Sequence, residues 1–136
     1  MPELSDKLKP GLTGTAEIVV GTRDTAPHVG SGKIGVLATP IMVNLMEAAA
    51  LQAVERFMPA GHQTVGTHLD VKHFAATPVG MRVVAHAELV KVDARTLTFR
   101  IRAEDEREAI GEGMHERLII NVERFDVRMQ RKLGKA

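Results

Sequence analysis

The sequence predicts an α+β fold in which a curved antiparallel sheet of five strands wraps around one central helix. First, residues 41–54 are apolar on nearly every side, whereas a surface helix has one apolar stripe and one charged face. Second, from residue 64 onward apolar residues recur at every second position, which is the period of a β-strand. Third, the links between the expected strands are short, which requires antiparallel neighbours. The helix is therefore expected to be enclosed by the sheet.

The expected helix runs from Thr39 to Met58. Thr39 is predicted to be its N-cap, because Pro40 then takes the first helical position. Residues 59–61, which read Pro-Ala-Gly, are expected to end it. The apolar run is too short and too interrupted for a membrane span, which needs about 20 apolar residues. The three interruptions are Asn44, Glu47 and Gln52.

Five strands are predicted, at residues 13–20, 64–74, 81–92, 95–103 and 109–122. In the second strand the odd-numbered residues should face the helix, and His73 is among them. In the third and fourth strands the odd-numbered residues from Met81 to Leu89 and from Leu97 to Ile101 should also face inward. In the fifth strand the even-numbered residues should face inward, namely Ile110, Met114, Leu118, Ile120 and Val122. A strand, a helix and a four-stranded meander in this order form the hot-dog architecture. Pairing of two copies would cover the edge strands of so small a sheet.

The connection at residues 21–38 contains four Gly and one Pro and has no sustained period. Loops of that length in a compact domain are usually functional lids or are disordered. Because this one leads directly into the enclosed helix, it is predicted to be a lid or the edge of a site.

The 136 residues are expected to form one domain, with a loose lead-in at residues 1–12 and a basic tail at residues 128–136. Lys and Arg total 18 against 17 Asp and Glu, so no excess charge points to nucleic acid or to a membrane. Four Phe without Trp or Tyr argue against a base-stacking surface. The lack of Cys excludes disulfides and thiolate metal sites. Together with a polar N-terminus, it favours a cytoplasmic protein.

Glu47 is the first candidate for chemistry, because its neighbours one helical turn away are almost all apolar. A carboxylate in such surroundings loses hydration at considerable cost unless it is paired, hydrogen-bonded or protonated. Such an environment suits a general acid or base. The structural alternative is a glutamate that bonds the backbone or Asn44. His73 should project from the sheet toward Glu47, and its structural alternative is a satisfied core histidine.

Three stretches carry a family likeness, ATPIMVNLMEAA at residues 38–49, GTHLDVKHFAATPVG at 66–80 and GEGMHERLIINVERFDV at 111–127. Between about residues 36 and 127 the chain resembles the fluoroacetyl-CoA thioesterase-like branch of the hot-dog thioesterases. The resemblance implies hydrolysis of an acyl-CoA to the free acid and CoA, with CoA as part of the substrate and no separate cofactor. It also implies a homodimer or a dimer of dimers.

The family's catalytic trio falls on Thr39, Glu47 and His73. The resemblance implies that Glu47 activates water or attacks the carbonyl carbon, that His73 assists proton transfer, and that Thr39 donates its hydroxyl near the carbonyl. A backbone N–H at Gly66 or at the helix start would complete an oxyanion site. Arg117, in the H-E-R motif, would contact the CoA arm or guard the pocket, and a strand-face ion pair is its alternative.

Thr39 and Glu47 are eight residues apart, about 12 Å along a regular helix, so Thr39 either folds back or acts elsewhere along the substrate. His68 lies on the opposite strand face from His73, so no metal site is expected there. The fluoroacetyl-selective form of the family has aromatic residues before the helix, and residues 21–38 contain none, which leaves the acyl group open.

Two other classes stay open. A hot-dog hydratase or dehydratase would use a different Asp/His motif, which is absent. A non-catalytic acyl-CoA-binding or regulatory protein would have little use for an acid and an imidazole directed at each other. Hydrolysis, hydration or binding without turnover, tested on a panel of short acyl-CoAs, separates the three.

Overall fold

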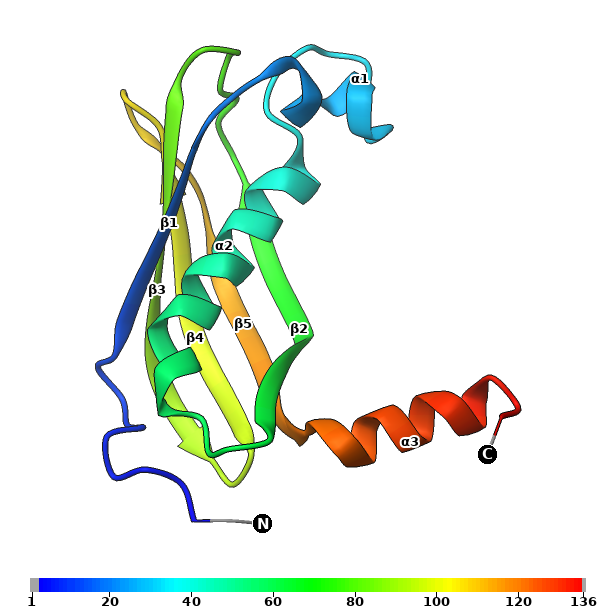
Figure 1. The fold of residues 1–136 in the computed structure, drawn as a ribbon. Coiled ribbons are helices and arrows are strands. Elements are labelled where there is room, and N and C mark those ends of the chain that lie inside the picture. The colour runs from blue at the N-terminus through cyan, green and yellow to red at the C-terminus, as the bar shows by residue number, and fades with distance from the viewer. Residues whose placement is uncertain (1–2, 136) are drawn as a thin grey trace.

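The central element of the fold is α2 (Thr39–Val54), which lies against the concave face of a curved sheet (Figure 1). The computed structural model describes residues 3–135. The sheet has five antiparallel strands in the order β1-β3-β4-β5-β2. These are β1 (Thr13–Val19), β2 (His62–His73), β3 (Arg82–Asp93), β4 (Thr96–Glu104) and β5 (Ala109–Asn121). The predicted α+β arrangement is confirmed, and each strand boundary lies within two residues of its predicted position.

The hydrophobic core lies between α2 and the inner face of the sheet. Met42, Met46 and Ala49 of α2 are 0% exposed. The inward residues of β3 and β4 are those predicted, namely Val83, Ala85, Ala87, Leu89, Leu97, Phe99 and Ile101. Burial of one large side chain of this kind contributes roughly 1.5–3 kcal/mol. The helix packs mainly on β1 and β3 and meets β2 at few points, so much of β2 has no helix over it.

The start of α2 differs from the prediction. Ala38 is the N-cap, Thr39 is the first helical residue, and Pro40 follows it. The Thr39 hydroxyl bonds the ring of His73 instead of a backbone amide of its own helix, so its predicted capping role is wrong. The helix ends at Val54 and is followed by a short 3₁₀ turn at Glu55–Phe57.

A β-bulge in β2 divides the strand into two halves of opposite orientation. The register with β5 shifts between Gly66 and His68, so one residue, Thr67, has no partner. Beyond the bulge the predicted inward face is confirmed at Val71, which packs against the core, and at the half-buried His73, whereas Leu69 is 39% exposed. Before the bulge it is wrong, because the even-numbered Thr64 is buried at 7% exposure.

A second irregularity reverses the predicted orientation of β5. Ala103 pairs with Gly111 and Glu104 with Ala109, so Ile110 is the extra residue. From that point the odd-numbered residues face inward. His115, Arg117 and Ile119 are buried, whereas Met114 is 37% exposed. The predicted inward positions at Met114, Leu118, Ile120 and Val122 are therefore wrong, and two ionisable side chains point into the molecule instead.

The connection before α2 folds into two short helices, η1 (Thr22–Asp24) and α1 (Ala26–Val29). An isolated β-bridge between Thr25 and Leu37 closes the segment on itself, and a second one, between Val36 and Pro78, ties it to the turn before β3. Residues 31–35, between α1 and Val36, are all exposed. This segment lies over the end of α2 that carries Thr39 (Figure 1).

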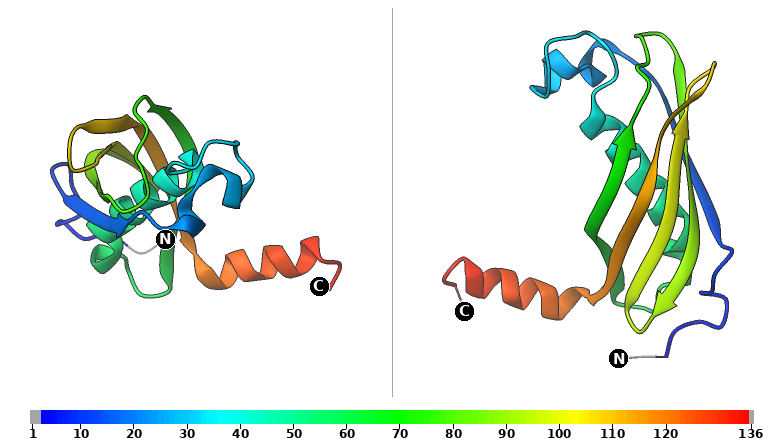
Figure 2. Two further views of the ribbon diagram at one scale, coloured as in Figure 1. Left: turned by 90° about the horizontal axis from the view of Figure 1, so that it is seen from above. Right: turned by 180° about the vertical axis from the view of Figure 1, so that it is seen from behind.

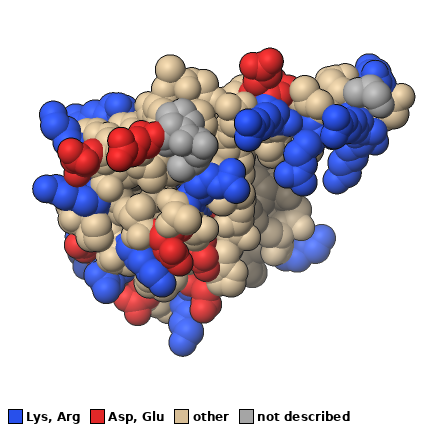
Figure 3. All heavy atoms as spheres, turned by 90° about the horizontal axis from the view of Figure 1, so that it is seen from below, with Lys and Arg blue, Asp and Glu red and all other residues tan. Residues whose placement is uncertain are grey.

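The C-terminal segment forms a helix, α3 (Val122–Lys132), where a loose basic tail from residue 128 was predicted. The side chain of Asn121 caps it by accepting a hydrogen bond from the Arg124 amide at 3.0 Å. α3 projects away from the sheet and contains no buried residue (Figure 2). Lys and Arg side chains gather along it in the view from below (Figure 3).

Within residues 3–135 no helix combines the length and the apolar character needed to cross a membrane.

Candidate active site

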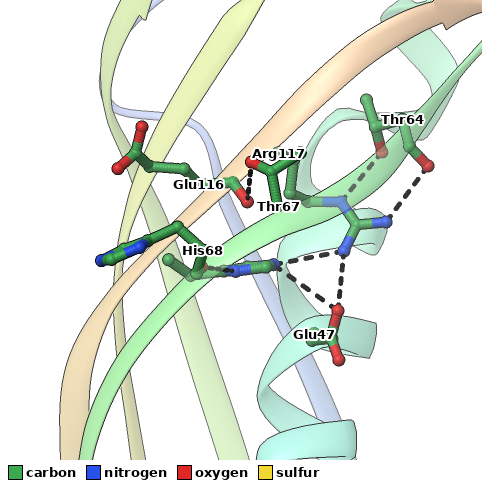
Figure 4. Close-up of polar contacts among 7 residues, drawn as sticks. Glu47, Thr64, Thr67, His68, Glu116 and Arg117 are labelled. Atoms are coloured by element: carbon green, nitrogen blue, oxygen red, sulfur yellow. Dashed lines mark hydrogen bonds and ion pairs between the residues drawn. The ribbon is translucent and has the colours of Figure 1, made fainter.

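The side chain of Glu47 emerges from the middle of α2 toward β2 and β5, and its position is set by Arg117 (Figure 4). Nη1 of Arg117 donates to Oε2 of Glu47 at 3.4 Å, and Nε2 of His115 lies 3.9 Å from the same oxygen. The Glu47 side chain is 35% exposed, whereas that of Arg117 is 8% exposed. The carboxylate is thus anchored on its inner side by a buried cation and remains open to solvent on the other side.

Arg117 is held from several directions. Its Nε donates to the hydroxyl of Thr64 at 2.9 Å and its Nη2 donates to the Thr64 carbonyl at 3.2 Å. Burial lowers the pKa of the guanidinium from its ordinary value, and the charge of Glu47 partly offsets this. A buried cation of this kind requires its counter-charge, so Arg117 and Glu47 form a unit.

His115 completes the buried end of this group and is 0% exposed. Its Nδ1 lies 2.8 Å from the carbonyl oxygen of His68, and its Nε2 lies 3.2 Å from Nη1 of Arg117. Burial lowers the pKa of the His115 ring, and the neighbouring charge of Arg117 acts in the same direction. Because a guanidinium can only donate, Nε2 offers its lone pair to Arg117, which requires a neutral ring.

Gly66 allows the strand to approach Glu47 closely. A Cβ atom at this position would lie 2.5 Å from Oε2 of Glu47 and 3.2 Å from Cε1 of His115. Any side chain here would displace the carboxylate. The glycine sits at the start of the β2 bulge, so the backbone of the bulge forms one wall beside Glu47.

Thr39 and His73 form a second group. The hydroxyl of Thr39 lies 2.8 Å from Nδ1 of His73. Burial lowers the pKa of the His73 ring. Its Nε2 is buried and has no hydrogen-bond partner within residues 3–135. Both residues line a cavity of about 320 Å³ whose other walls come from the segment before α2 and from residues 74–76.

The structure thus brings the predicted site residues together in two groups. Thr39 and His73 meet at the start of α2, whereas Glu47, Gly66 and Arg117 meet eight residues further along the helix. The prediction that His73 faces Glu47 does not hold within one chain. The helix is regular from Thr39 onward, so the start of α2 and Glu47 are separated by about 12 Å.

Sequence reasoning missed His115 and Thr64 as parts of the site. His115 and Arg117 are two residues apart and must share a strand face, so the burial of one implies the burial of the other. Their orientation depends on the extra residue at Ile110, which the apolar pattern did not reveal.

Within residues 3–135 no three His, Cys, Asp or Glu side chains form a group that could hold a metal ion.

Comparison with known proteins supports one family. The model of the fluoroacetyl-CoA-specific thioesterase family matches residues 20–123. A fluoroacetyl-CoA thioesterase of Streptantibioticus cattleyicolor is 36% identical over 135 residues, which is 95% of this chain and 97% of that protein.

Solved structures give the same result. A structure of the fluoroacetyl-CoA thioesterase superposes with a TM-score of 0.88 at 35% identity, covering 93% of this chain and 98% of the other. A hypothetical protein of Thermus thermophilus, described as a thioesterase superfamily member, superposes with a TM-score of 0.89 at 26% identity, covering 96% and 97%. The chain therefore belongs to the fluoroacetyl-CoA-specific thioesterase family of hot-dog proteins.

Proposed function

We propose that the protein hydrolyses an acyl-CoA thioester at a site shared by two protomers, in which Glu47 of one protomer works with Thr39 and His73 of the other. Hydrolysis of an acyl-CoA thioester follows from membership of the family. The roles of the residues are inferred from the position of the Glu47 carboxylate, which Arg117 anchors beside the β-bulge at Gly66.

Glu47 is the general base in this proposal. Its exposed side accepts a proton from water while the water oxygen bonds to the carbonyl carbon of the thioester. The backbone N–H at Gly66 donates to the oxyanion that develops. When the tetrahedral intermediate collapses, the carbon–sulfur bond breaks and a proton passes to the sulfur, leaving a carboxylic acid and CoA thiol. Arg117 supports this chemistry by fixing the position of the carboxylate.

In this proposal Thr39 and His73 of the other protomer supply the proton donor. The Thr39 residue is exposed, and its hydroxyl is oriented by the ring of His73. A hydroxyl held in this way contacts the carbonyl or the leaving group and passes the proton on. The cavity beside these two residues is the proposed place for the acyl group.

An open edge strand supports the shared site. β2 is the last strand of the sheet, and its residues 66–70 are all exposed, including the apolar Leu69 at 39%. Unpaired edges of this kind are normally covered. An antiparallel pairing of two β2 strands centred near Leu69 places the partner's His73 opposite residues 65–66, beside Glu47. The two separated groups then form one site.

Replacement of Glu47 by Gln tests the central role. We expect E47Q to release CoA from a panel of acyl-CoAs at least about 1,000-fold more slowly, because Gln cannot take a proton. E55Q, at the exposed glutamate just after α2, is the matched control and should retain full activity. Unchanged hydrolysis by E47Q would remove Glu47 from the mechanism.

A single-turnover reaction in ¹⁸O-water gives a positive test for attack by the carboxylate, because only that route can bring label into Glu47. A general base leaves the label in the product acid only. Label in the Glu47 side chain would instead show that the carboxylate attacks the carbonyl and forms an anhydride.

The same panel addresses the acyl group. Fluoroacetyl-CoA and acetyl-CoA belong in it, since mutants of the similar fluoroacetyl-CoA thioesterase have been solved with fluoroacetate and CoA and with acetyl-CoA. Residues 21–38 contain no aromatic side chain, and Phe74 is the aromatic residue that lines the cavity. We therefore propose that the fluorinated and the plain acetyl substrates are hydrolysed with similar kcat/KM. A large preference for fluoroacetyl-CoA would contradict this.

A further inference from the structure

We propose that His115 is a positioning residue for hydrolysis, which holds Arg117 through its Nε2 lone pair and the Gly66 bulge through its Nδ1–H. The inference rests on the proposed role of Glu47. It assigns a task to a side chain that makes no hydrogen bond to Glu47, although its Nε2 lies 3.9 Å from Oε2 of that residue.

The two ring nitrogens of His115 have different partners, and these determine where the proton is. A carbonyl oxygen can only accept, so Nδ1 carries the hydrogen and donates to His68 at 2.8 Å. A guanidinium can only donate, so Nε2 must offer its lone pair to Nη1 of Arg117 at 3.2 Å. Only the neutral ring with the proton on Nδ1 satisfies both partners. The lowering of the pKa of His115 by burial agrees with this state.

The contact with Arg117 decides where the guanidinium sits. Nη1 is the nitrogen that Arg117 directs toward Glu47, and it lies closer to Nε2 of His115, at 3.2 Å, than to Oε2 of Glu47, at 3.4 Å. Nη1 carries two hydrogens and can donate to the imidazole and to the carboxylate at once, so without the imidazole acceptor the guanidinium would shift toward the carboxylate and pull it inward. His115 thus keeps the carboxylate at the position from which its outer side can reach a water molecule.

The contact with His68 stabilises the bulge. His68 follows the unpaired Thr67 directly, and its carbonyl points to Nδ1 of His115. The edge of the same ring lies beneath Gly66, where a Cβ would be 3.2 Å from Cε1. One buried ring therefore fixes both the cation beside Glu47 and the backbone proposed as the oxyanion donor.

The competing explanation is that His115 only fills the core. Its ring packs against Phe99 with a centroid distance of 6.1 Å and an interplanar angle of 31°. A space-filling role predicts that substitutions change stability and leave the kinetics of the folded protein unaltered. The experiment must therefore read kcat and KM as well as melting temperature.

Two substitutions separate the functions of the two nitrogens. Gln places an amide oxygen near the position of Nε2 and can still accept from Arg117. Asn reaches only the position of Nδ1. We expect H115Q to keep kcat within about tenfold of the wild type and H115N to lose about 100-fold, with KM changed little in both. Equal kcat losses in the two variants, or a loss confined to melting temperature, would overturn the proposal.

His62 supplies a matched control. It is also buried, on the neighbouring strand, and its Nδ1 lies 3.0 Å from a backbone carbonyl, that of Ala60. H62N should lower the melting temperature and leave kcat unchanged. A fall in kcat equal to that of H115N would show that loss of any buried histidine has this effect, and it would contradict the inference.

A double-mutant cycle with R117K tests whether His115 acts through Arg117. If it does, H115N lowers kcat much less in the R117K background than in the wild type, and fully additive losses would refute the link.

E47Q measured in parallel keeps the two proposals apart. Turnover by E47Q overturns the role of Glu47, whereas the cycle still decides how His115 and Arg117 depend on each other. If H115N fails to fold, the cycle is run with H115Q and His115→Met, and Met must show the larger loss.

Discussion

Thr39 and His73 form a hydrogen-bond pair, with 2.8 Å between Oγ1 and Nδ1, that joins the first residue of α2 to the last residue of β2. The pair explains why a threonine at the helix start does not cap its own helix. It also places a hydroxyl, oriented by an imidazole, at the wall of a cavity of about 320 Å³. The hydroxyl of Thr39 therefore bonds a side chain of β2 and not the backbone of its own helix.

Substitutions at Thr39 should separate the hydroxyl from the shape of the side chain. We expect T39V, which preserves the shape but removes the hydroxyl, to lower kcat about 100-fold. T39S retains the hydroxyl and should stay within about tenfold of the wild type. Release of CoA under saturating substrate measures both. Wild-type kcat in T39V would exclude the hydroxyl from proton transfer.

Mixing of two inactive variants tests the shared site. If Glu47 and His73 of one site come from different protomers, a dimer of an E47Q chain and an H73A chain contains one intact site and one doubly altered site. Random exchange should restore about a quarter of wild-type activity, since half of the dimers are mixed and half of their sites are intact.

The control is each variant mixed with itself, which should remain inactive. Sedimentation of both variants checks that they still associate. Failure of the mixture to regain activity, in dimers that demonstrably exchange, would place the complete site within one chain.

Replacement of Gly66 by Ala should damage the site through a steric effect. The added Cβ would lie 2.5 Å from Oε2 of Glu47, so the carboxylate must move. A displacement of about 1 Å at a catalytic group lowers the rate about 100-fold. G35A is the control, because a Cβ at that glycine meets no atom within 4 Å. Equal kcat values for G66A and G35A would show that this close approach is irrelevant to turnover.

Stability should fall on mild acidification. Burial lowers the pKa of His73 and of His115, whereas the unfolded chain has imidazoles near the ordinary value of 6.5. Below 6.5 the unfolded chain binds protons that the folded chain does not, so the free energy of unfolding decreases as the pH falls through that range. Melting temperatures should be level above this value and decline below it. A melting temperature that rises between about pH 6.5 and pH 5 would contradict this sign.

Asp105 affects stability in a separate, more acidic pH range. Burial pushes the pKa of its carboxyl up, but hydrogen bonds from two backbone amides and from the Thr77 hydroxyl outweigh this and lower it below 3.8. Its contribution to stability is present above 3.8 and is lost as the pH falls through the lower folded value. T77V should therefore leave the decline in melting temperature below pH 6.5 in place, because Asp105 titrates in a more acidic range.

Much of the fold could be predicted from local patterns. The strands alternate apolar and polar residues, the helix is apolar on nearly every side, and both signals lie within short windows of sequence. The inward faces of β3 and β4 were right for the same reason. The basic C-terminal segment was not predicted as α3, because its polar and charged composition resembled that of a solvated tail.

The sequence by itself determined the order of elements, the apolar helix with an acid in its middle, and the residue types of the candidate site. Tertiary structure decided which of them meet. Extra residues at Thr67 and Ile110 are defined by pairing between strands, and each reverses every side chain beyond it. That reversal turned His115 and Arg117 inward beside Glu47. A regular helix from Thr39 onward separated Glu47 from the pair formed by Thr39 and His73.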